Sequence, residues 1–368
     1  MKIGILTFHR AYNYGAVIQA YCLQKILDKL NAEAEVIDYL LNKQIKYTSL
    51  YSFRHGYKSV LKNLILLTLH KKRVARKLKF DNFVRKLKIS KIKYENLNDL
   101  ESSNNNYDAI VVGSDQVWNV KKKEEVSDAY FLSFANDKIY KFSYAASIGL
   151  STKVDLNSKK GYLSRFNQIS CREKGGSQIL YELLNKSVDT VLDPTLLIDS
   201  EELNKIAANI QLKNYLFYYT LDGFDKRNNN KKIIIEIAKK FDLNVFILAP
   251  EWPFHSYGHN LVDVGPEEFL GLIKNANLVC TNSFHGTALS IKFNTPFYVL
   301  ESKDDKDERK RNILSQLDLE NRILPSINSL CKLSNYKLDY KQTNSKLKEL
   351  RVNSFRFLKK CIGEIKCN

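Results

Sequence analysis

Four loops carry the side chains that could do chemistry, and each one follows directly on a short apolar run. They span residues 9–15, 113–119, 170–173 and 280–287. Together they hold cations, carboxylates, amides, hydroxyls and a histidine, which are groups that bind anions and sugars and transfer protons. Ligands of parallel α/β sheets bind at the carboxyl ends of the strands, so we expect these loops to meet at one site.

The loop 280–287 provides the strongest candidate for proton transfer. His285 lies at the start of a predicted helix, and its imidazole is the side chain that titrates near neutral pH. Around it, Asn282 and Ser283 offer an amide and a hydroxyl, and Gly286 gives a permissive backbone. We therefore predict a catalytic role for His285, although a histidine at a helix start also fits a purely structural role.

The other loops suggest sugar and anion recognition. The loop 113–119 suits sugars, because carboxylate and amide groups bind hydroxyls and an indole can cover a ring face; as a simple capped turn it would need only Ser114 or Asp115. The loop 9–15 precedes a predicted helix whose free N–H groups attract anions, and Gly15 lets a ligand approach the backbone. It contains no G-x-G-x-x-G sequence, so dinucleotide binding is not indicated. The loop 170–173 places Arg172 beside a carboxylate, which an ordinary surface ion pair would explain equally well.

Apolar runs that alternate with helical periodicity predict the elements that position these loops, and they are typical of parallel α/β units. The predicted strands are 2–8, 34–39, 107–112, 141–147, 168–171, 190–192, 215–220, 244–248, 278–280 and 297–300, and the predicted helices include 16–30, 231–241, 267–274, 287–293 and 346–365. At about 150 residues per domain, a chain of 368 residues has room for two domains.

We therefore predict an α/β fold of two Rossmann-like domains. The first spans residues 1–205 and includes a basic helical insertion at about 50–93; the second spans 206–325 and is expected to bind the donor. The remaining residues, 326–368, are predicted to form a helical tail that packs back on the N-terminal domain.

Composition excludes several classes of protein. With 44% hydrophobic and 27% charged residues the chain can bury full cores, which argues against disorder. Its longest apolar runs fall far short of the ~20 residues that span a bilayer. Six cysteines without a C-x-x-C pair indicate reduced, mostly buried thiols rather than a disulfide frame or a zinc site, and hence a cytoplasmic protein.

Positive charge is concentrated in one segment. Residues 54–93 contain fourteen Lys or Arg and one acid, which gives 14 − 1 = +13 of the net charge of +18. Their helical pattern, with Leu64 and Ile65 on one face, fits a surface that docks on anionic lipid heads or on a lipid-pyrophosphate-linked substrate. A solvated helical face is an equally good explanation. Nucleic acid is disfavoured as a partner, since no stacking platform or known module is visible.

Five segments taken together resemble the polysaccharide pyruvyl transferase family. The resemblance is collinear from the first strand to about residue 322 and leaves the basic helices and the C-terminal helix outside it. The segments that carry it are Asn13-Tyr14-Gly15, Gly113-Ser114-Asp115-Gln116-Val117-Trp118-Asn119, Ser170-Cys171-Arg172-Glu173, Asp193-Pro194-Thr195 and Thr281-Asn282-Ser283-Phe284-His285-Gly286.

This resemblance implies a fold similar to the GT-B glycosyltransferases and transfer of pyruvate from phosphoenolpyruvate onto a sugar as a ketal. Some members of the family carry an arginine just before the histidine, where this chain has Phe284. The cation that faces the donor must then come from elsewhere, and Arg172 and Arg311 are the candidates. The predicted donor-binding set is Arg172, Asn282, Ser283, Gly286 and Arg311.

The chemistry of the donor supports these assignments independently. Phosphoenolpyruvate carries a carboxylate and a phosphate, so its pocket needs cations and helix N-termini. Ketal formation needs a proton on the methylene carbon, for which His285 is the candidate, and a base near the sugar hydroxyls, for which Asp115 is a weaker one. No metal or cofactor is required. The predicted acceptor-binding residues are Asn13, Tyr14, Gly15, Ser114, Gln116, Trp118 and Asn119.

Two other functions share the predicted fold. A glycosyltransferase of GT-B type would use a nucleotide sugar, and Asp305 and Asp307 form a D-x-D pattern of the kind that binds a metal in such enzymes, although a solvated charged loop explains the pattern better. A non-catalytic carbohydrate-binding protein would have no use for the histidine and the cations. The expected acceptor is a polysaccharide or lipid-linked oligosaccharide precursor, met in the cytoplasm or at the inner face of the membrane.

Overall fold

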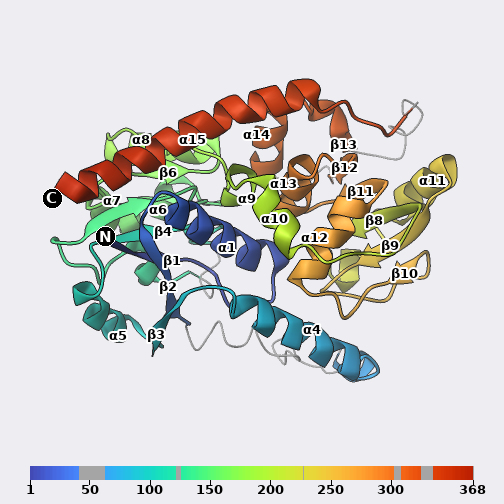
Figure 1. Ribbon diagram of the computed structural model, residues 1–368, viewed down its shortest axis with the longest axis horizontal. Helices are drawn as coiled ribbons and strands as arrows, with labels where there is room; N and C mark the ends of the chain where they lie inside the picture. The colour runs from blue at the N-terminus through green and yellow to red at the C-terminus, as the bar shows by residue number, and fades with distance from the viewer. Residues whose placement is uncertain (41–62, 122–125, 227, 302–307, 325–334, 368) are drawn as a thin grey trace.

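Two parallel β-sheets, one from each half of the chain, organise the molecule (Figure 1). The computed structural model describes residues 1–40, 63–121, 126–226, 228–301, 308–324 and 335–367. In spatial order the first sheet consists of β3 (Ile89–Tyr94), β2 (Glu33–Tyr39), β1 (Lys2–Leu6), β4 (Ala109–Val112) and β5 (Tyr140–Ser143). The second consists of β10 (His259–Asn260), β9 (Asn244–Leu248), β8 (Tyr215–Tyr219), β11 (Leu278–Thr281), β12 (Phe297–Leu300) and β13 (Ile323–Leu324).

The central strands are buried on both faces, as their continuous apolar sequences require. In β1, Ile3 pairs with Ala34 on one side and with Ala109 on the other, and all three are fully buried. Helices cover the faces of such sheets, so strands like this one are apolar throughout and do not alternate. A short parallel pair, β6 (Ser170–Cys171) and β7 (Asp189–Thr190), extends the first sheet through isolated bridges beyond β5.

Thirteen α-helices have both ends in the described part of the chain, and residues 63–67 are helical as well. In chain order they are α1 (Tyr14–Lys29), α4 (His70–Val84), α5 (Leu97–Glu101), α6 (Lys153–Leu156), α7 (Lys160–Ser164), α8 (Lys174–Leu184), α9 (Pro194–Leu197), α10 (Ser200–Ile206), α11 (Lys231–Phe241), α12 (Pro266–Asn275), α13 (Phe284–Lys292), α14 (Glu308–Gln316) and α15 (Lys341–Cys367).

The structure differs from the sequence prediction in the basic segment. Its last part is not helical: Ile89–Tyr94 forms β3, which pairs with β2 in register Val36↔Ile89 and Tyr39↔Tyr94. The sequence of this edge strand places lysines between apolar residues. Charged residues are common on edge strands but also fit the exposed face of a helix, so the segment was predicted to be helical. The part of the segment that precedes residue 63 lies outside the described residues.

Two further boundaries differ. The strand predicted to run to residue 147 ends at Ser143, and Ala145 takes a left-handed backbone with φ 52°, which no strand continues through. Helix α13 begins at Phe284, three residues before the predicted start, because the Ser283 side chain caps it and accepts from the Gly286 N–H.

Helix α15 spans the top edge of the molecule in Figure 1, from the second sheet to a C-terminus beside the first. It packs on the N-terminal half through Ser354, whose Oγ accepts from the Leu192 N–H at 3.0 Å, and through Arg351, whose Nη2 donates to the Leu197 carbonyl at 2.8 Å. Neither α15 nor any other described helix is both long and apolar enough to span a membrane.

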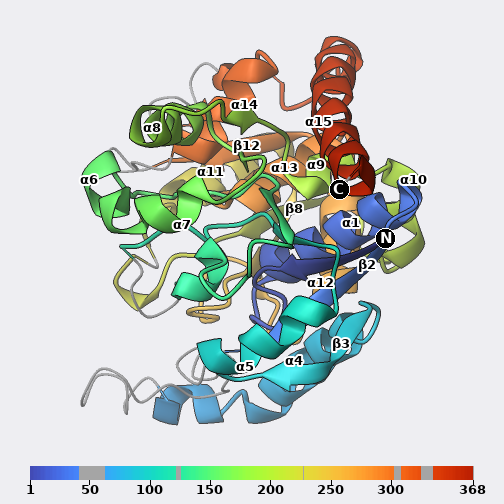
Figure 2. The ribbon, with the colours of Figure 1, turned by 90° about the vertical axis from the view of Figure 1, so that its left-hand side faces the viewer.

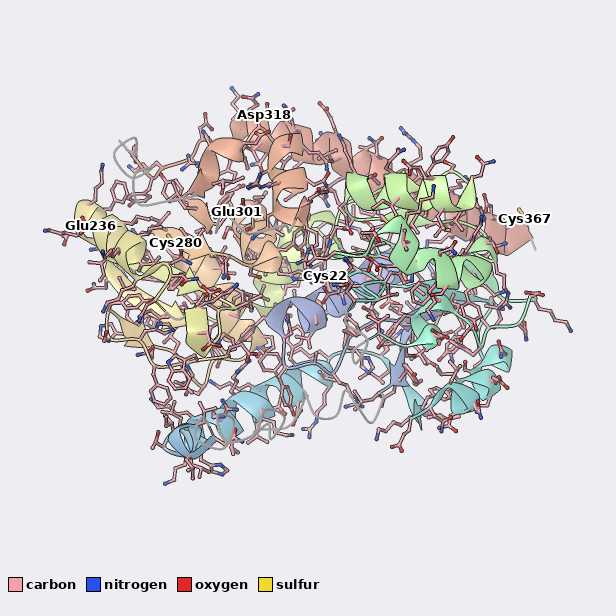
Figure 3. All side chains as sticks on the ribbon, turned by 180° about the vertical axis from the view of Figure 1, so that it is seen from behind. Cys22, Glu236, Cys280, Glu301, Asp318 and Cys367 are labelled. Carbon is pink, nitrogen blue, oxygen red and sulfur yellow. The ribbon has the colours of Figure 1, made fainter. Side chains whose placement is uncertain are left out.

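The cysteines that the structure describes carry free thiols. Four of them, Cys22, Cys171, Cys280 and Cys361, are buried, and Cys367 is exposed near the chain end. Figure 3 labels Cys22 near the middle of the molecule and Cys280 in the C-terminal half. For these five residues the prediction of unpaired, mostly buried thiols is confirmed; Cys331 lies outside the described residues.

Candidate active site

Loops that follow β4, β6, β7 and β11 bring a cluster of charged side chains together around Asp193. The Asp193 carboxylate is buried and accepts from Ser114 Oγ at 2.7 Å and from Arg172 Nη1 at 2.8 Å, both at Oδ2. Its Oδ1 accepts from the hydroxyl and the backbone N–H of Thr195. Burial opposes ionisation, but His285, Arg172 and Ser114 hold the pKa of Asp193 well below its usual range.

Arg172 is a buried cation with unused donors. Its guanidinium carbon lies 4.1 Å from the centre of the Phe284 ring, and its Nη2 lies 3.8 Å from Asp115 Oδ1. Within the described part of the chain, Arg172 Nε and Nη2 have no hydrogen-bond partner. Phe284 thus supplies a ring face that supports the Arg172 guanidinium.

His285 sits where the first turns of α13 and α1 meet. Its Nε2 lies 3.6 Å from Asp193 Oδ2, an ion-pair distance longer than a hydrogen bond, and this nitrogen has no hydrogen-bond partner among the described residues. The ring packs on Gly15, where a Cβ would lie 2.0 Å from His285 Nδ1. Gly15 therefore has a steric role: any larger residue would displace the imidazole.

Two further carboxylates lie in the cluster. Asp115 has a left-handed backbone, with φ 78°, and its Oδ1 accepts from the Gln116 N–H at 2.8 Å. Burial opposes its ionisation, but nearby positive charge on His285, Arg172 and Arg309 lowers the pKa of Asp115. A non-glycine residue in this conformation is uncommon, although aspartate adopts it more readily than most residues.

Glu173 is the N-cap residue of α8 and is buried. Its Oε1 accepts from Ser147 Oγ at 2.9 Å and from the Ile148 N–H at 3.0 Å, whereas its Oε2 has no hydrogen-bond partner among the described residues. Burial raises the pKa of Glu173. The carboxyl thus fixes the loop that follows β5 next to Arg172.

The predicted donor residues Asn282, Ser283 and Gly286 lie between the end of β11 and the first turn of α13, and each makes a local structural contact. Ser283 caps α13, and Gly286 packs against Thr281, where a Cβ would lie 2.6 Å from the hydroxyl oxygen. Asn282 bridges two strand ends: its Oδ1 accepts from the Leu221 N–H, and its Nδ2 donates to Asp222.

Arg311, the other candidate for the cation facing the donor, lies apart from the cluster. It is 61% exposed and pairs with Glu301, which Figure 3 labels in the C-terminal half. Two residues earlier on α14, Arg309 contacts the Gln116 side-chain amide at 2.7 Å and so reaches across to the first domain. The fold thus brings Arg309 toward the cluster, whereas the donor role of Arg311 stays a prediction.

Two predicted acceptor contacts belong to the core. Trp118 is fully buried beside Phe131, and its Nε1 donates to the Tyr130 carbonyl at 2.8 Å. Tyr14 is fully buried too, and its hydroxyl donates to the Val264 carbonyl at 2.8 Å. Rings enclosed on all sides cannot cover a sugar, so the prediction of acceptor contacts for these two side chains is wrong.

The other predicted acceptor residues lie nearer the cluster or within it. The Ser114 hydroxyl donates its hydrogen bond to Asp193. The Asn13 side chain caps α1 by accepting from the Ala16 N–H. Gln116 and Asn119 hydrogen-bond to each other through their side chains, close to Gly149. Amides on a loop that also carries Asp115 remain suitable for binding hydroxyl groups.

Sequence reasoning missed Asp193, Glu173 and Arg309 as site residues. Asp193 and Glu173 both stood within the motifs already noted, and the first of them looked like the opening of a turn. Arg309 was hidden in a charged run. No group of three or more metal-ligating side chains lies among the described residues, and Asp305 and Asp307 fall outside them.

Comparison with known structures shows the GT-B fold. A UDP-N-acetylglucosamine 2-epimerase from Rickettsia bellii is 10% identical, with 100% of this chain and 97% of that chain covered at a TM-score of 0.55. The corresponding epimerase from Methanocaldococcus jannaschii is 15% identical, covering 96% and 100% at 0.53. The structure of S. aureus MnaA with UDP is 12% identical, covering 97% and 89% at 0.53.

No curated protein sequence matches the chain. A family model, by contrast, matches residues 13–304, which contain all the loops of the cluster. Its description is "Polysaccharide pyruvyl transferase". With most of its length matched, and with the predicted two-domain α/β fold confirmed, the chain belongs to the polysaccharide pyruvyl transferase family.

Proposed function

We propose that the protein transfers pyruvate from phosphoenolpyruvate to two hydroxyls of one sugar, forming a ketal and releasing phosphate. The observation that carries the proposal is the buried Arg172 with two unused donors, next to an unpartnered His285 Nε2. Leaving such atoms unsatisfied costs free energy, which an anionic ligand would recover. Family membership narrows that ligand to a pyruvyl donor.

The donor is bound by cations from both domains. Arg172 of the first domain is placed to bind the carboxylate or the phosphate through Nε and Nη2. Arg309 of the second domain faces the same carboxylates and provides a second positive charge for a ligand with two anionic groups. The first turn of α13, which carries His285, adds the N–H groups of a helix start.

The reaction then needs three proton transfers: one to the methylene carbon of the donor and one from each of the two sugar hydroxyls, of which the departing phosphate takes up one. A proton is added to the methylene carbon of the donor, the first sugar hydroxyl attacks the adjacent carbon, and this hydroxyl loses its proton. The bond from that carbon to the phosphate oxygen breaks, phosphate leaves, and the second hydroxyl attacks and gives up its proton. His285 is assigned to deliver the proton to carbon, and Asp115 to accept one from a hydroxyl.

The acceptor is a sugar of a polysaccharide or of a lipid-linked oligosaccharide precursor. Gln116 and Asn119 are the amides assigned to its hydroxyls, with Asn13 at the start of α1. The reaction requires no further cofactor. Free buried thiols agree with a reducing compartment, and we place the enzyme in the cytoplasm, at the inner face of the membrane.

Phosphate release from phosphoenolpyruvate, measured with a panel of nitrophenyl and lipid-linked glycosides, tests this proposal. The expected result is phosphate release that depends on one class of glycoside, with a product heavier than that glycoside by one pyruvyl ketal. Sugar transfer from a UDP-sugar without any use of phosphoenolpyruvate would instead identify a nucleotide-sugar enzyme, the activity class of the GT-B neighbours.

A further inference from the structure

One side of the basic segment exposes leucines and lysines together. Leu64, Leu67 and Leu78 are 57%, 50% and 56% exposed, and Lys71 and Lys72 are exposed between them in sequence. Lys71 and Leu78 are seven residues apart on α4, two helical turns, so they share a face. Lys72 is turned by about 100° from Lys71, toward the side of Lys79, and is exposed at the margin of that face. These five residues are called the leucine–lysine face below.

The opposite side of α4 is used within the protein. Phe80 and Phe83 are buried, and Arg76 Nη2 donates to the Tyr12 carbonyl at 3.0 Å. Lys79 pairs with Glu268 at 2.6 Å and Lys86 with Glu267 at 3.0 Å, which ties α4 to the first turn of α12 in the second domain. These cations therefore serve the contact between the domains.

Lys71 and Lys72 differ from those cations. Neither forms an ion pair with a carboxylate of any described residue. Figures 1 and 2 both place α4 at the edge of the molecule opposite α15, where a large flat partner could approach without meeting either sheet. The structure thus leaves two cations and three leucines exposed along residues 64–78.

The chemistry of this face points to lipid. Leucines that remain more than half exposed gain free energy by entering the acyl boundary of a bilayer, and lysines beside them are attracted to anionic head groups. Single-stranded RNA would need aromatic side chains for stacking, and the phenylalanines of α4 are buried. We propose that the leucine–lysine face docks the protein on an anionic lipid bilayer.

Docking there would also orient the site. Arg76 on the inner side of α4 contacts the Tyr12 carbonyl and lies 5.3 Å from the Tyr14 ring centre, so α4 is fixed to the loop that contains Asn13. A bilayer held against α4 would then lie near the start of α1, where the proposed function assigns Asn13 to a lipid-linked acceptor. Vesicle binding itself needs no substrate, so it can be tested whether or not the proposed function holds.

Sedimentation with vesicles tests the proposal. The full-length protein should bind vesicles of phosphatidylcholine with phosphatidylglycerol, bind vesicles of phosphatidylcholine alone much more weakly, and lose binding as salt rises. The variant Lys71→Gln/Lys72→Gln should bind anionic vesicles about thirtyfold more weakly, at about fivefold per charge. Leu67→Gln/Leu78→Gln should also weaken binding, with less dependence on salt.

A matched control removes the same charge elsewhere. Lys232 and Lys239 are exposed on α11, a helix of the second domain, and Lys232→Gln/Lys239→Gln should bind anionic vesicles like the wild type. Circular dichroism should show all three variants folded. Three results would overturn the proposal: no binding of the wild type to anionic vesicles, equal losses in the α4 and α11 lysine variants, or binding of RNA in preference to vesicles.

Discussion

Two regions join the domains, and they differ in how fully their buried polar atoms are paired. Among the described residues, the region around Tyr14 holds one such atom without a hydrogen-bond partner, Arg76 Nε, whereas the cluster around Asp193 holds four, on Arg172, Glu173 and His285. Around Tyr14, the hydroxyl donates to the Val264 carbonyl, the ring stacks on Phe269 at 4.5 Å, and both Glu268 oxygens are engaged, by Lys79 and by the Gly265 N–H. Around Asp193, Arg172 and His285 keep buried nitrogens that no described residue hydrogen-bonds. Tyr14 and Phe269 are buried, as are Arg172 and His285, so exposure of these side chains does not explain the difference.

The comparison separates stability from binding. A buried polar group with a partner costs little, whereas one without a partner destabilises the folded state. We infer that the Tyr14 region holds the two domains together and that the Asp193 cluster retains unsatisfied donors because a ligand uses them. Each of the following predictions would sharpen or break that division.

The largest effect is expected from His285→Asn. Loss of general acid catalysis typically costs ~10²- to 10⁴-fold in rate, or about 3–5 kcal/mol of barrier. Turnover of phosphoenolpyruvate should fall by an amount in that range, while KM for the donor stays within about tenfold. Near-normal turnover in this variant would leave His285 with a structural role.

A somewhat smaller effect, on stability, is expected from Asp193→Asn. Removing one partner of a buried ion pair typically costs about 3 kcal/mol, because Arg172 loses its counter-charge. The depressed pKa of Asp193 means that its stabilisation is present above the ordinary pKa of 3.8 and is lost as the pH falls below it. Urea unfolding at several pH values should show a shallower acid dependence in the variant.

Its control is Asp137→Asn, which removes an exposed carboxylate that pairs with Arg165. Exposed ion pairs contribute little, so this variant should unfold like the wild type at pH 7. Equal losses of stability in both variants would contradict the special position of Asp193.

Arg309 and Arg311 offer a matched pair on one helix. Arg309→Gln removes a charge that faces the cluster, and KM for phosphoenolpyruvate should rise about tenfold to hundredfold, the range for a lost hydrogen bond to a charged group. Arg311→Gln removes an exposed partner of Glu301, and KM should stay within about twofold. Steady-state kinetics with both variants decides which arginine binds the donor; the reverse pattern would restore Arg311.

The smallest effect is expected from Tyr14→Phe, which removes one buried hydroxyl and keeps the ring. The free energy of unfolding should fall by about 1 kcal/mol, while KM and kcat stay unchanged, because this region joins the domains and does not bind the donor. A large rise in KM with unchanged stability would assign Tyr14 to the ligand and break the comparison.

Much of the fold could be predicted from the sequence, because periodicity reports burial directly. Helix 231–241 and strand 244–248 appear with the predicted bounds. The edge strand β3 was not predicted, because the spacing of its lysines fits a helix as well as it fits a strand that is exposed on one side. A local sequence pattern does not show which strand of the sheet an edge strand pairs with.

The site was predicted in part for a similar reason. Spacing after strands located His285, Arg172 and Asp115, since all post-strand loops of a parallel sheet meet at one edge. It could not show that Trp118 turns inward, or that Arg309 rather than Arg311 crosses to the other domain. Those outcomes depend on how the two domains pack, which involves residues far apart in sequence.

Thermal unfolding with candidate donors tests the central claim most directly. If the Asp193 cluster binds phosphoenolpyruvate, saturating donor should raise the melting temperature, since a ligand at a hundred times its Kd stabilises the native state by about 2.7 kcal/mol. Arg172→Gln should abolish that rise, and UDP-N-acetylglucosamine should produce none in the wild type. Stabilisation by UDP-N-acetylglucosamine, with none by phosphoenolpyruvate, would contradict the account.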